Sequence, residues 1–426
     1  MKSYGSFCPV AKAAEILAER WTLLVLRDLL LGSRHFNDLR RGVPQMSPTL
    51  LSKRLQTLKA AGVIERVNRQ VNNVPTLTDS NGIVHVAKFF DPNLVNPWGV
   101  GESPTSPFWV ADNGASVSTL YNTAGQPLSL VVAIPAPGNP QGASGAPTGL
   151  VFNIARAQNA FVITGVDGSG TPTSGPAFFL FAAEDGTILG WNPGVNPPGF
   201  DPATAGKHAI IAVDNSANPD AANGAIYKGL AIAEDGNDNP FLYATNFRAG
   251  TVEVYDATFH RTAFSANAFV DPHLPRGYAP FNVVPIAGKL FVTYAVQDAD
   301  KEDDVAGQGH GIIDTFSLTG QMLARFAQHG QLDSPWGVAL APAGFGQFNG
   351  DLLIGNFGNG HINAFNPTTG EFIDKVRNPH GQAIAIDGLW TIMFGNGGSG
   401  GDPHTLYFTA GPNDESDGLF GSLTAN

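Results

Sequence analysis

Short apolar runs, each stopped by Gly, Asn or Pro, recur along most of this chain. Three of them follow one another at residues 335–340, 350–356 and 360–366, and the third alternates between apolar and polar positions. Alternation with a period of two is typical of a half-buried β-strand. The pattern therefore predicts a meander of three short strands, which would bury too little surface to be stable alone.

Copies of the same meander supply the missing surface. Similar runs begin near residues 97, 147, 228, 280, 335 and 387, about fifty residues apart except for one longer interval after residue 147. Strand meanders repeating at this interval are the signature of a β-propeller. The sequence therefore predicts an all-β propeller of six blades over residues 71–426.

Two details of this ring are also predicted. In the second blade we expect strands at residues 146–152, 161–164 and 187–191, and we attribute the long interval to a Pro- and Gly-rich insert at residues 192–223. We expect a strand from residues 75–86 to complete the last blade, because a ring that closes on itself leaves no exposed strand edge.

The first seventy residues follow a helical pattern instead. Apolar positions on one face predict helices at about residues 10–20, 21–31 and 35–41. Ser47 and Pro48 then provide an N-cap and a first helical position, and a stripe of leucines follows. A short helix, a tight turn and a longer helix form a helix-turn-helix. The fold expected for the whole chain is a small all-α head followed by the propeller.

Charge separates the two parts as well. Residues 1–70 hold 12 Lys and Arg against 5 Asp and Glu, a net charge of +7, and because the chain carries −12 the remainder carries −19. A basic head suggests an anionic partner, nucleic acid first. Only 14% of all residues are charged, and Gly and Pro number 51 and 31, which suits a turn-rich β protein.

The stretches 8–10, 19–24, 29–32, 36–41 and 47–55 resemble the HxlR-type winged-helix transcriptional regulators. The resemblance covers residues 7–67 and implies dimeric DNA binding, with the helix that starts at Ser47 in the major groove. The family continues into a return wing strand and a terminal helix, whereas this sequence changes character at residues 68–75. The head, residues 1–70, is therefore expected to have a truncated wing.

Polar and basic residues on the exposed face of that helix, together with one arginine of the wing, are the predicted contacts to bases and phosphates. These DNA-binding residues are Ser47, Thr49, Ser52, Lys53, Arg54 and Arg66. Cys8 is the single cysteine, so it has no intrachain partner. It has two interpretations, a thiol switch as in several members of the family or a small buried residue packed beside Trp21.

The propeller also resembles a known group. The stretches 91–99, 281–283, 334–338 and 407–413 are similar to a bacterial family of uncharacterised, NHL-like propeller proteins, over residues 75–424. Members of that family are typically exported. This sequence shows neither a signal-peptide pattern nor an apolar run long enough to span a membrane, so the expectation is a cytoplasmic protein with no membrane partner.

Candidate sites on the propeller are few. Asn113, Asn246 and Asn356 each follow the second strand of a blade, so the ring could bring them together to bind a ligand, although Asn also suits the turn there. Trp98 and Trp336 are interpreted as packing wedges. The acidic run 298–304 lacks a calcium-loop pattern and is interpreted as a solvated loop. No spacing typical of zinc, phosphate or nucleophile sites appears, so no metal, cofactor or catalytic residue is predicted.

Two functions follow from these features. In the first, the head binds operator DNA, as a homodimer if the resemblance holds, and the propeller binds a small ligand or a protein partner. In the second, the propeller is a binding or hydrolytic module, as in lactonase-like propellers, and the head is vestigial or the product of an artefactual fusion. The sequence alone leaves both open, as well as whether the chain is an enzyme.

Overall fold

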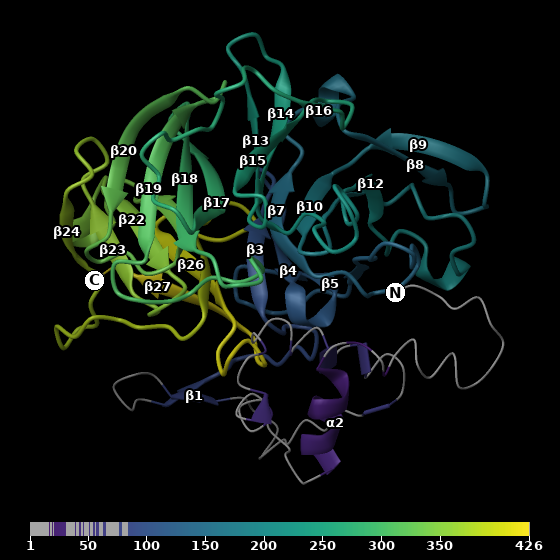
Figure 1. Ribbon diagram of the computed structural model, residues 1–426, viewed down its shortest axis with the longest axis horizontal. Coiled ribbons are helices and arrows are strands. Elements are labelled where there is room, and N and C mark those ends of the chain that lie inside the picture. Colours follow the sequence, from purple (N-terminus) through teal and green to yellow (C-terminus); the bar gives the residue numbers. More distant parts are fainter. Residues whose placement is uncertain are drawn as a thin grey trace.

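A computed structural model describes residues 84–425 continuously. Before them it describes residues 21–30, residues 76–78 and thirteen single positions (17, 19, 39, 42, 43, 46, 51, 54, 55, 57, 58, 63 and 64). The strands form a ring of sheets, and helix α2 (Thr22–Leu30) lies outside that ring (Figure 1). No helix in the described part of the chain is both long and apolar enough to cross a membrane.

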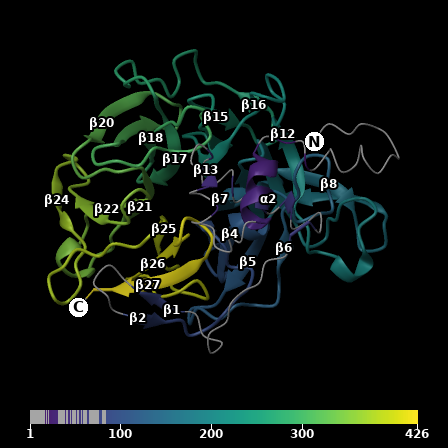
Figure 2. The same cartoon turned by 60° about the horizontal axis from the view of Figure 1, so that its bottom comes forward.

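Six sheets surround one axis, so the predicted six-bladed propeller is confirmed (Figure 2). Each blade is a contiguous stretch of chain with antiparallel neighbours. The strands of the first three blades are β3 (Pro97–Gly101), β4 (Phe108–Asp112), β5 (Val117–Tyr121) and β6 (Val132–Ala133); β7 (Pro147–Phe152), β10 (Phe179–Ala183), β11 (Thr187–Trp191) and β12 (Ile210–Asp214); and β13 (Tyr227–Glu234), β14 (Pro240–Asn246), β15 (Thr251–Tyr255) and β16 (Arg261–Thr262).

The remaining blades continue the ring in chain order. Their strands are β17 (Tyr278–Ile286), β18 (Lys289–Val296), β19 (Gly311–Ser317) and β20 (Met322–Gln328); β21 (Pro335–Leu340), β22 (Leu352–Asn356), β23 (Ile362–Phe365) and β24 (Phe372–Lys375); and β25 (Leu389–Phe394), β26 (Thr405–Ala410) and β27 (Leu419–Thr424).

The sixth blade differs from the prediction. Among the described residues it has three strands, where the other five blades have four, and neither residues 76–78 nor residues 84–86 complete it. Instead β1 (Thr76–Thr78) and β2 (Val84–Val86) pair with each other in a separate two-stranded sheet. Each of these strands is paired along one edge only, and neither is added to β27, so the expected closure by this segment was wrong.

The second blade was also predicted incorrectly in part. The apolar run at 161–164 belongs to a hairpin of β8 (Val162–Val166) and β9 (Pro172–Pro176), and the second strand of the blade is β10. The insert at 192–223 also contains β12, the outer strand of the blade. The long interval therefore comes from an added hairpin as well as from a long connection to the outer strand.

The ring holds together because the inner strands approach one another closely. Each inner strand contacts the next one around the axis, from β3 through β7, β13, β17 and β21 to β25, which returns to β3. Glycines at the approach points permit this. A Cβ built on Gly149 of β7 would lie 2.3 Å from the backbone nitrogen of Leu230 in β13, which is sterically forbidden.

Apolar side chains fill the spaces between blades, as the alternating pattern predicts. One cluster between the second and third blades includes Phe161, Leu180, Tyr227 and Leu242, and similar clusters lie between later blades. The described head residues have a core of their own, formed by Val25, Leu39, Val43, Met46, Leu51 and Leu58. Of the leucine stripe predicted for the head, Leu51 and Leu58 are therefore buried and Leu55 is partly buried.

We expect Gly149→Ala to lower the free energy of unfolding of the propeller by about 2 kcal/mol or more, because the added methyl group meets backbone and not a movable side chain. Gly236→Ala is the matched control, since a Cβ there meets nothing within 4 Å. Urea denaturation of both variants checks the expectation. Equal urea midpoints for Gly149→Ala and Gly236→Ala would show that the inner strands can move apart without loss of stability.

Candidate functional site on the propeller axis

Six side chains, one from the inner strand of each blade, occupy the axis of the ring. In chain order they are Trp98, Thr148, Lys228, Phe281, Trp336 and Trp390, and all six are buried. The aromatic members pack on one another: the Trp98 and Trp390 rings stack with centroids 3.5 Å apart, and Trp336 meets Trp98 edge-on at 6.2 Å. Side chains therefore fill this part of the axis, and the lysine is the one charged group among the six.

Lys228 is only 1% exposed, so its ammonium needs partners inside the protein. Its Nζ lies 2.5 Å from Oε1 of Glu184, which follows β10, and 3.1 Å from Oδ1 of Asp303, in the loop between β18 and β19. The ring of Trp98 lies 5.1 Å from Nζ, within the range of a cation–π contact. Three blades besides its own thus hold this ammonium in place.

Carboxylates outnumber the ammonium in this cluster. Glu415, in the loop between β26 and β27, is buried, and its Oε2 accepts a hydrogen bond of 2.7 Å from Nδ2 of Asn96. Burial, with repulsion from Asp303 and Glu184, raises the pKa of the Glu415 carboxyl to about 8. Burial likewise raises the pKa of Asp304 to about 6. We call Glu184, Lys228, Asp303, Asp304 and Glu415 the axial charge cluster.

The pKa of the lysine is also raised, but for a different reason. Burial alone would lower the pKa of the Lys228 ammonium, but the attraction of Glu184 and Asp303 outweighs it and the pKa is raised. Near neutral pH these shifts favour a proton on Glu415 and a charged Lys228. Among the residues that the structure describes, no three His, Cys, Asp or Glu side chains are arranged to hold a metal ion.

The structure does not bring the three predicted asparagines together on a common partner. Asn113 joins the axial charge cluster, where its Nδ2 donates to Oε2 of Glu184 at 3.0 Å. Asn246 donates to Glu253 at 3.0 Å and also accepts from backbone N–H groups of its own blade. Asn356 donates to the backbone oxygen of Gln331 at 2.7 Å. Two of the three thus serve local turns, which is the alternative that the sequence had left open.

The acidic run 298–304 is not simply a solvated loop, so that interpretation was wrong. Asp303 points inward and is 8% exposed, while Glu302 pairs with Arg248 on the adjoining blade. The physical reason is Lys228, whose charge makes burial of a carboxylate favourable at this place. The interpretation of Trp98 and Trp336 as packing wedges is confirmed, because both are buried in one aromatic cluster.

Of the predicted DNA-binding residues, only Arg54 lies within the described part of the head. It is 9% exposed, and its Nη2 forms an ion pair of 2.6 Å with Oε2 of Glu19, so in this arrangement it supports the head and does not face a groove of DNA. Ser47, Thr49, Ser52, Lys53 and Arg66, as well as Cys8, lie outside the described residues. For those six positions the assignments stay predictions.

Sequence reasoning missed Lys228, Glu184 and Glu415. A signal for the first was present: Lys228 is the second residue of its inner strand, and at that position three other blades have Trp. A lysine in that register must be buried and paired. Nothing local marks Glu184 or Glu415, because their roles depend on how loops of separate blades meet.

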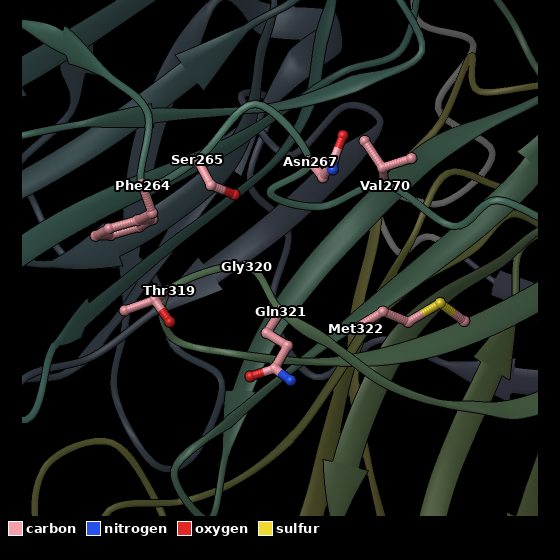
Figure 3. Close-up of a pocket in the computed structure, with 8 residues that line it drawn as sticks. All are labelled: Phe264, Ser265, Asn267, Val270, Thr319, Gly320, Gln321 and Met322. Atoms are coloured by element: carbon pink, nitrogen blue, oxygen red, sulfur yellow. The ribbon is translucent and has the colours of Figure 1, made fainter.

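A groove on the outside of the ring is a second candidate site. It has a volume of about 410 Å³ and is lined from two segments, the connection between β16 and β17 and the turn between β19 and β20 (Figure 3). Phe264, Val270 and Met322 supply apolar walls, and Asn267, Thr319 and Gln321 supply polar groups. The volume lies within the range of small-molecule sites.

Comparison with known proteins gives relatives for both parts of the chain. Over 348 residues the chain is 31% identical to an uncharacterised protein of Acanthamoeba polyphaga mimivirus, and the match covers 79% of this chain and 82% of the viral protein. The chain belongs to the same family as this viral protein. The bacterial origin and NHL-like type expected for the propeller family stay predictions, since this mimivirus family is uncharacterised.

The head has relatives of its own. Residues 16–79 match the HxlR-like helix-turn-helix family. Over 63 residues, 15% of this chain and 58% of the relative, the chain is 40% identical to YvaP, an uncharacterised HTH-type transcriptional regulator of Bacillus subtilis. The HxlR-type resemblance of the head is therefore confirmed.

Solved structures add nothing further on activity. A glucose dehydrogenase superposes with a TM-score of 0.44 at 12% identity, covering 83% of this chain and 100% of that protein. A likeness this loose carries no argument about what the mimivirus family does.

We expect Lys228→Met to lower the free energy of unfolding by about 3–5 kcal/mol, because it leaves Glu184 and Asp303 buried without their counter-ion. Lys289→Met, at an exposed position of β18, removes the same charge without this effect. Thermal denaturation of both variants checks the expectation. A Lys228→Met variant as stable as the control would show that the carboxyl groups simply take up protons.

Glu415 gives a pH dependence whose sign can be worked out. Its pKa is about 8 in the folded protein against a usual value of 4.5, so between these limits the native state holds a proton that the unfolded state has released. Stability from this group therefore falls as pH rises from about 4.5 to about 8. We expect Glu415→Gln to weaken that fall and to be more stable than the parent above about pH 8, by on the order of 1 kcal/mol or more. Melting curves across this range test it, and parallel pH profiles of variant and parent would contradict it.

Proposed function

We propose that this chain is a DNA-binding transcriptional regulator whose propeller binds a small ligand or a protein partner. The HxlR-like helix-turn-helix match over residues 16–79 carries the proposal. In this scheme the head reads operator DNA, and the propeller is the part that receives a signal.

Charge supports the DNA-binding role of the head. Its net charge of +7 over residues 1–70 suits a polyanion, whereas the remaining residues carry −19. An acidic propeller is repelled by phosphate, so its most acidic face must point away from bound DNA. Binding should consequently be strongly salt dependent, with the head supplying the attraction.

The propeller supports the second half of the proposal through its surface. The axis is filled near Lys228 by the side chains of the inner strands, so a ligand that threads the ring has no room there. The groove between the β16–β17 connection and the β19–β20 turn combines apolar and amide groups on an outer face. That combination suits a small molecule with both kinds of surface, or a side chain of a partner protein.

The DNA-binding half is tested with the full chain. Rounds of selection from a random duplex library should enrich one sequence, and mobility-shift titration should then give its affinity. We expect the double variant Ser52→Ala and Lys53→Ala, in the predicted recognition helix, to weaken binding by about tenfold or more and to reduce its salt slope.

The double variant Arg276→Ala and Lys289→Ala is the control, since both residues are exposed on the propeller. It should bind as tightly as the parent. The proposal fails if no duplex is enriched, or if the head variant binds the enriched duplex as well as the control does.

A further inference from the structure

The outer edge of blade six is open. Strand β27 is the last strand of a three-stranded sheet, and no strand among the described residues pairs with its outer side. In the other five blades a fourth strand covers the equivalent edge. An uncovered edge exposes a row of backbone donors and acceptors that another extended segment can pair with.

The entry to blade one repeats the geometry of the entry to blade five. The N–H of Ser334, just before β21, donates to the backbone oxygen of His310, just before β19, at 3.1 Å. The N–H of Asn96, just before β3, donates in the same way to the backbone oxygen of Asp417, just before β27, at 2.9 Å. Both corner residues have left-handed backbones, with φ of 46° at Ser334 and 44° at Asn96.

The next hydrogen bond of each corner is also the same. The backbone oxygen of Ser334 accepts from the N–H of Phe357 at 2.9 Å, and that of Asn96 accepts from the N–H of Asn113 at 3.1 Å. Ser334 and Asn96 are therefore equivalent positions, and the chain leading into each can be compared residue by residue.

Counting back from the corners identifies what is missing. Strand β20, residues 322–328, lies six to twelve positions before Ser334 and pairs with β19. Six to twelve positions before Asn96 lie residues 84–90. The hydrogen bond from Asn96 to Asp417 means that this segment leaves the corner beside the start of β27 and in the opposite chain direction, as an antiparallel partner requires.

In the structure this segment does not use that edge. Its first three residues form β2, where Val86 lies opposite Thr76 of β1. Large apolar side chains of the segment stay on the surface: Val86 is 62% exposed, Phe89 41% and Phe90 44%. Figures 1 and 2 both show the β1–β2 hairpin on the side of the ring where β27 is the outer strand.

We propose that the outer edge of β27 is a docking site for residues 84–90, which exchange between β1 and β27. The two corners match β19 to β27 and β20 to residues 84–90. If residues 84–90 pair with β27 in the register of β20 on β19, Phe89 lies opposite Phe420 and Val86 lies opposite Ser422. Opposed residues lie on the same face of a sheet. Phe89 would then extend the cluster in which the Phe420 ring packs against Phe108 and Tyr407.

Exchange has a consequence for the head, which rests on the proposed function. In the proposed exchange, residues 84–86 leave β1 when they add to β27, so docking dissolves the β1–β2 hairpin. The corner is also tied to the axial charge cluster, because the side chain of Asn96 donates to Glu415 and accepts from Nε1 of Trp390 at 3.0 Å. A change in the protonation of Glu415 would therefore act on Asn96, the corner residue that follows residues 84–90.

Cross-linking tests the exchange with a single reporter position. In a Cys8→Ser background, Val86→Cys is combined with Ser422→Cys for the docked state or with Thr76→Cys for the hairpin. Opposed antiparallel residues have Cα atoms about 4.5–5.5 Å apart, which suits a disulfide. We expect both pairs to cross-link under mild oxidation. Val86→Cys with Thr368→Cys, on the exposed β23–β24 turn, is the control that should not.

The proposal is overturned if the hairpin pair cross-links while the Ser422→Cys pair gives no more product than the control. Melting curves of the reduced variants establish that each is folded. If a variant is not, hydrogen exchange on the unmodified chain decides. Docking predicts that the β27 amides pointing away from β26 exchange more slowly than loop amides, and exchange as fast as in loops at those positions overturns it.

The link to the head is measured separately. The two cross-linked forms share the same cysteine at position 86, so their affinities for the selected duplex can be compared directly. We expect the two affinities to differ at least severalfold, and equal affinities would overturn the link. Absence of DNA binding in every form would instead remove the proposed function, while the cross-linking result would still stand for the docking site.

Discussion

Close approach of six inner strands around one axis is the constraint on which this structure depends. The backbone of β7 comes so near to that of β13 that Gly149 cannot carry a side chain. What remains at the axis must be filled by one residue per blade, and five of those six are aromatic or small. The sixth residue is Lys228. Its buried ammonium must be neutralised by carboxylates, and these come from other blades.

The solution couples blades that are distant in the sequence. Glu184, Asp303 and Glu415 come from three different connections, and each is useful only when the ring is closed. Burial, together with the excess of carboxyl groups, raises the pKa of Glu415 and favours its protonated form near neutral pH. The same residue holds Asn96, at the point where the chain enters the first blade. Charge at the axis, ring closure and the segment leading to the head are therefore physically connected.

Much of the fold could be predicted from the sequence, because the strands of each blade are close together in the chain. Its strands are contiguous and alternate in polarity, so six repeats were enough to predict six blades. The errors arose where pairing is not local. The run at 161–164 looked like a blade strand but forms an added hairpin, and residues 84–86 pair with β1 and not with β27. The axial charge cluster was missed for the same reason, since no local pattern states which loops meet at the centre.

The sixth blade has a topological consequence. Since every blade is built from its own stretch of chain, the seam between β25 and β3 is bridged by side chains, with the hydroxyls of Thr391 and Thr409 donating to the backbone oxygen of Trp98 at 2.7 and 2.6 Å. In the structure, no strand among the described residues is shared across this seam. The ring therefore has a cyclic order with no privileged first blade, and a circular permutant opened at any other connection between blades would keep all six sheets whole.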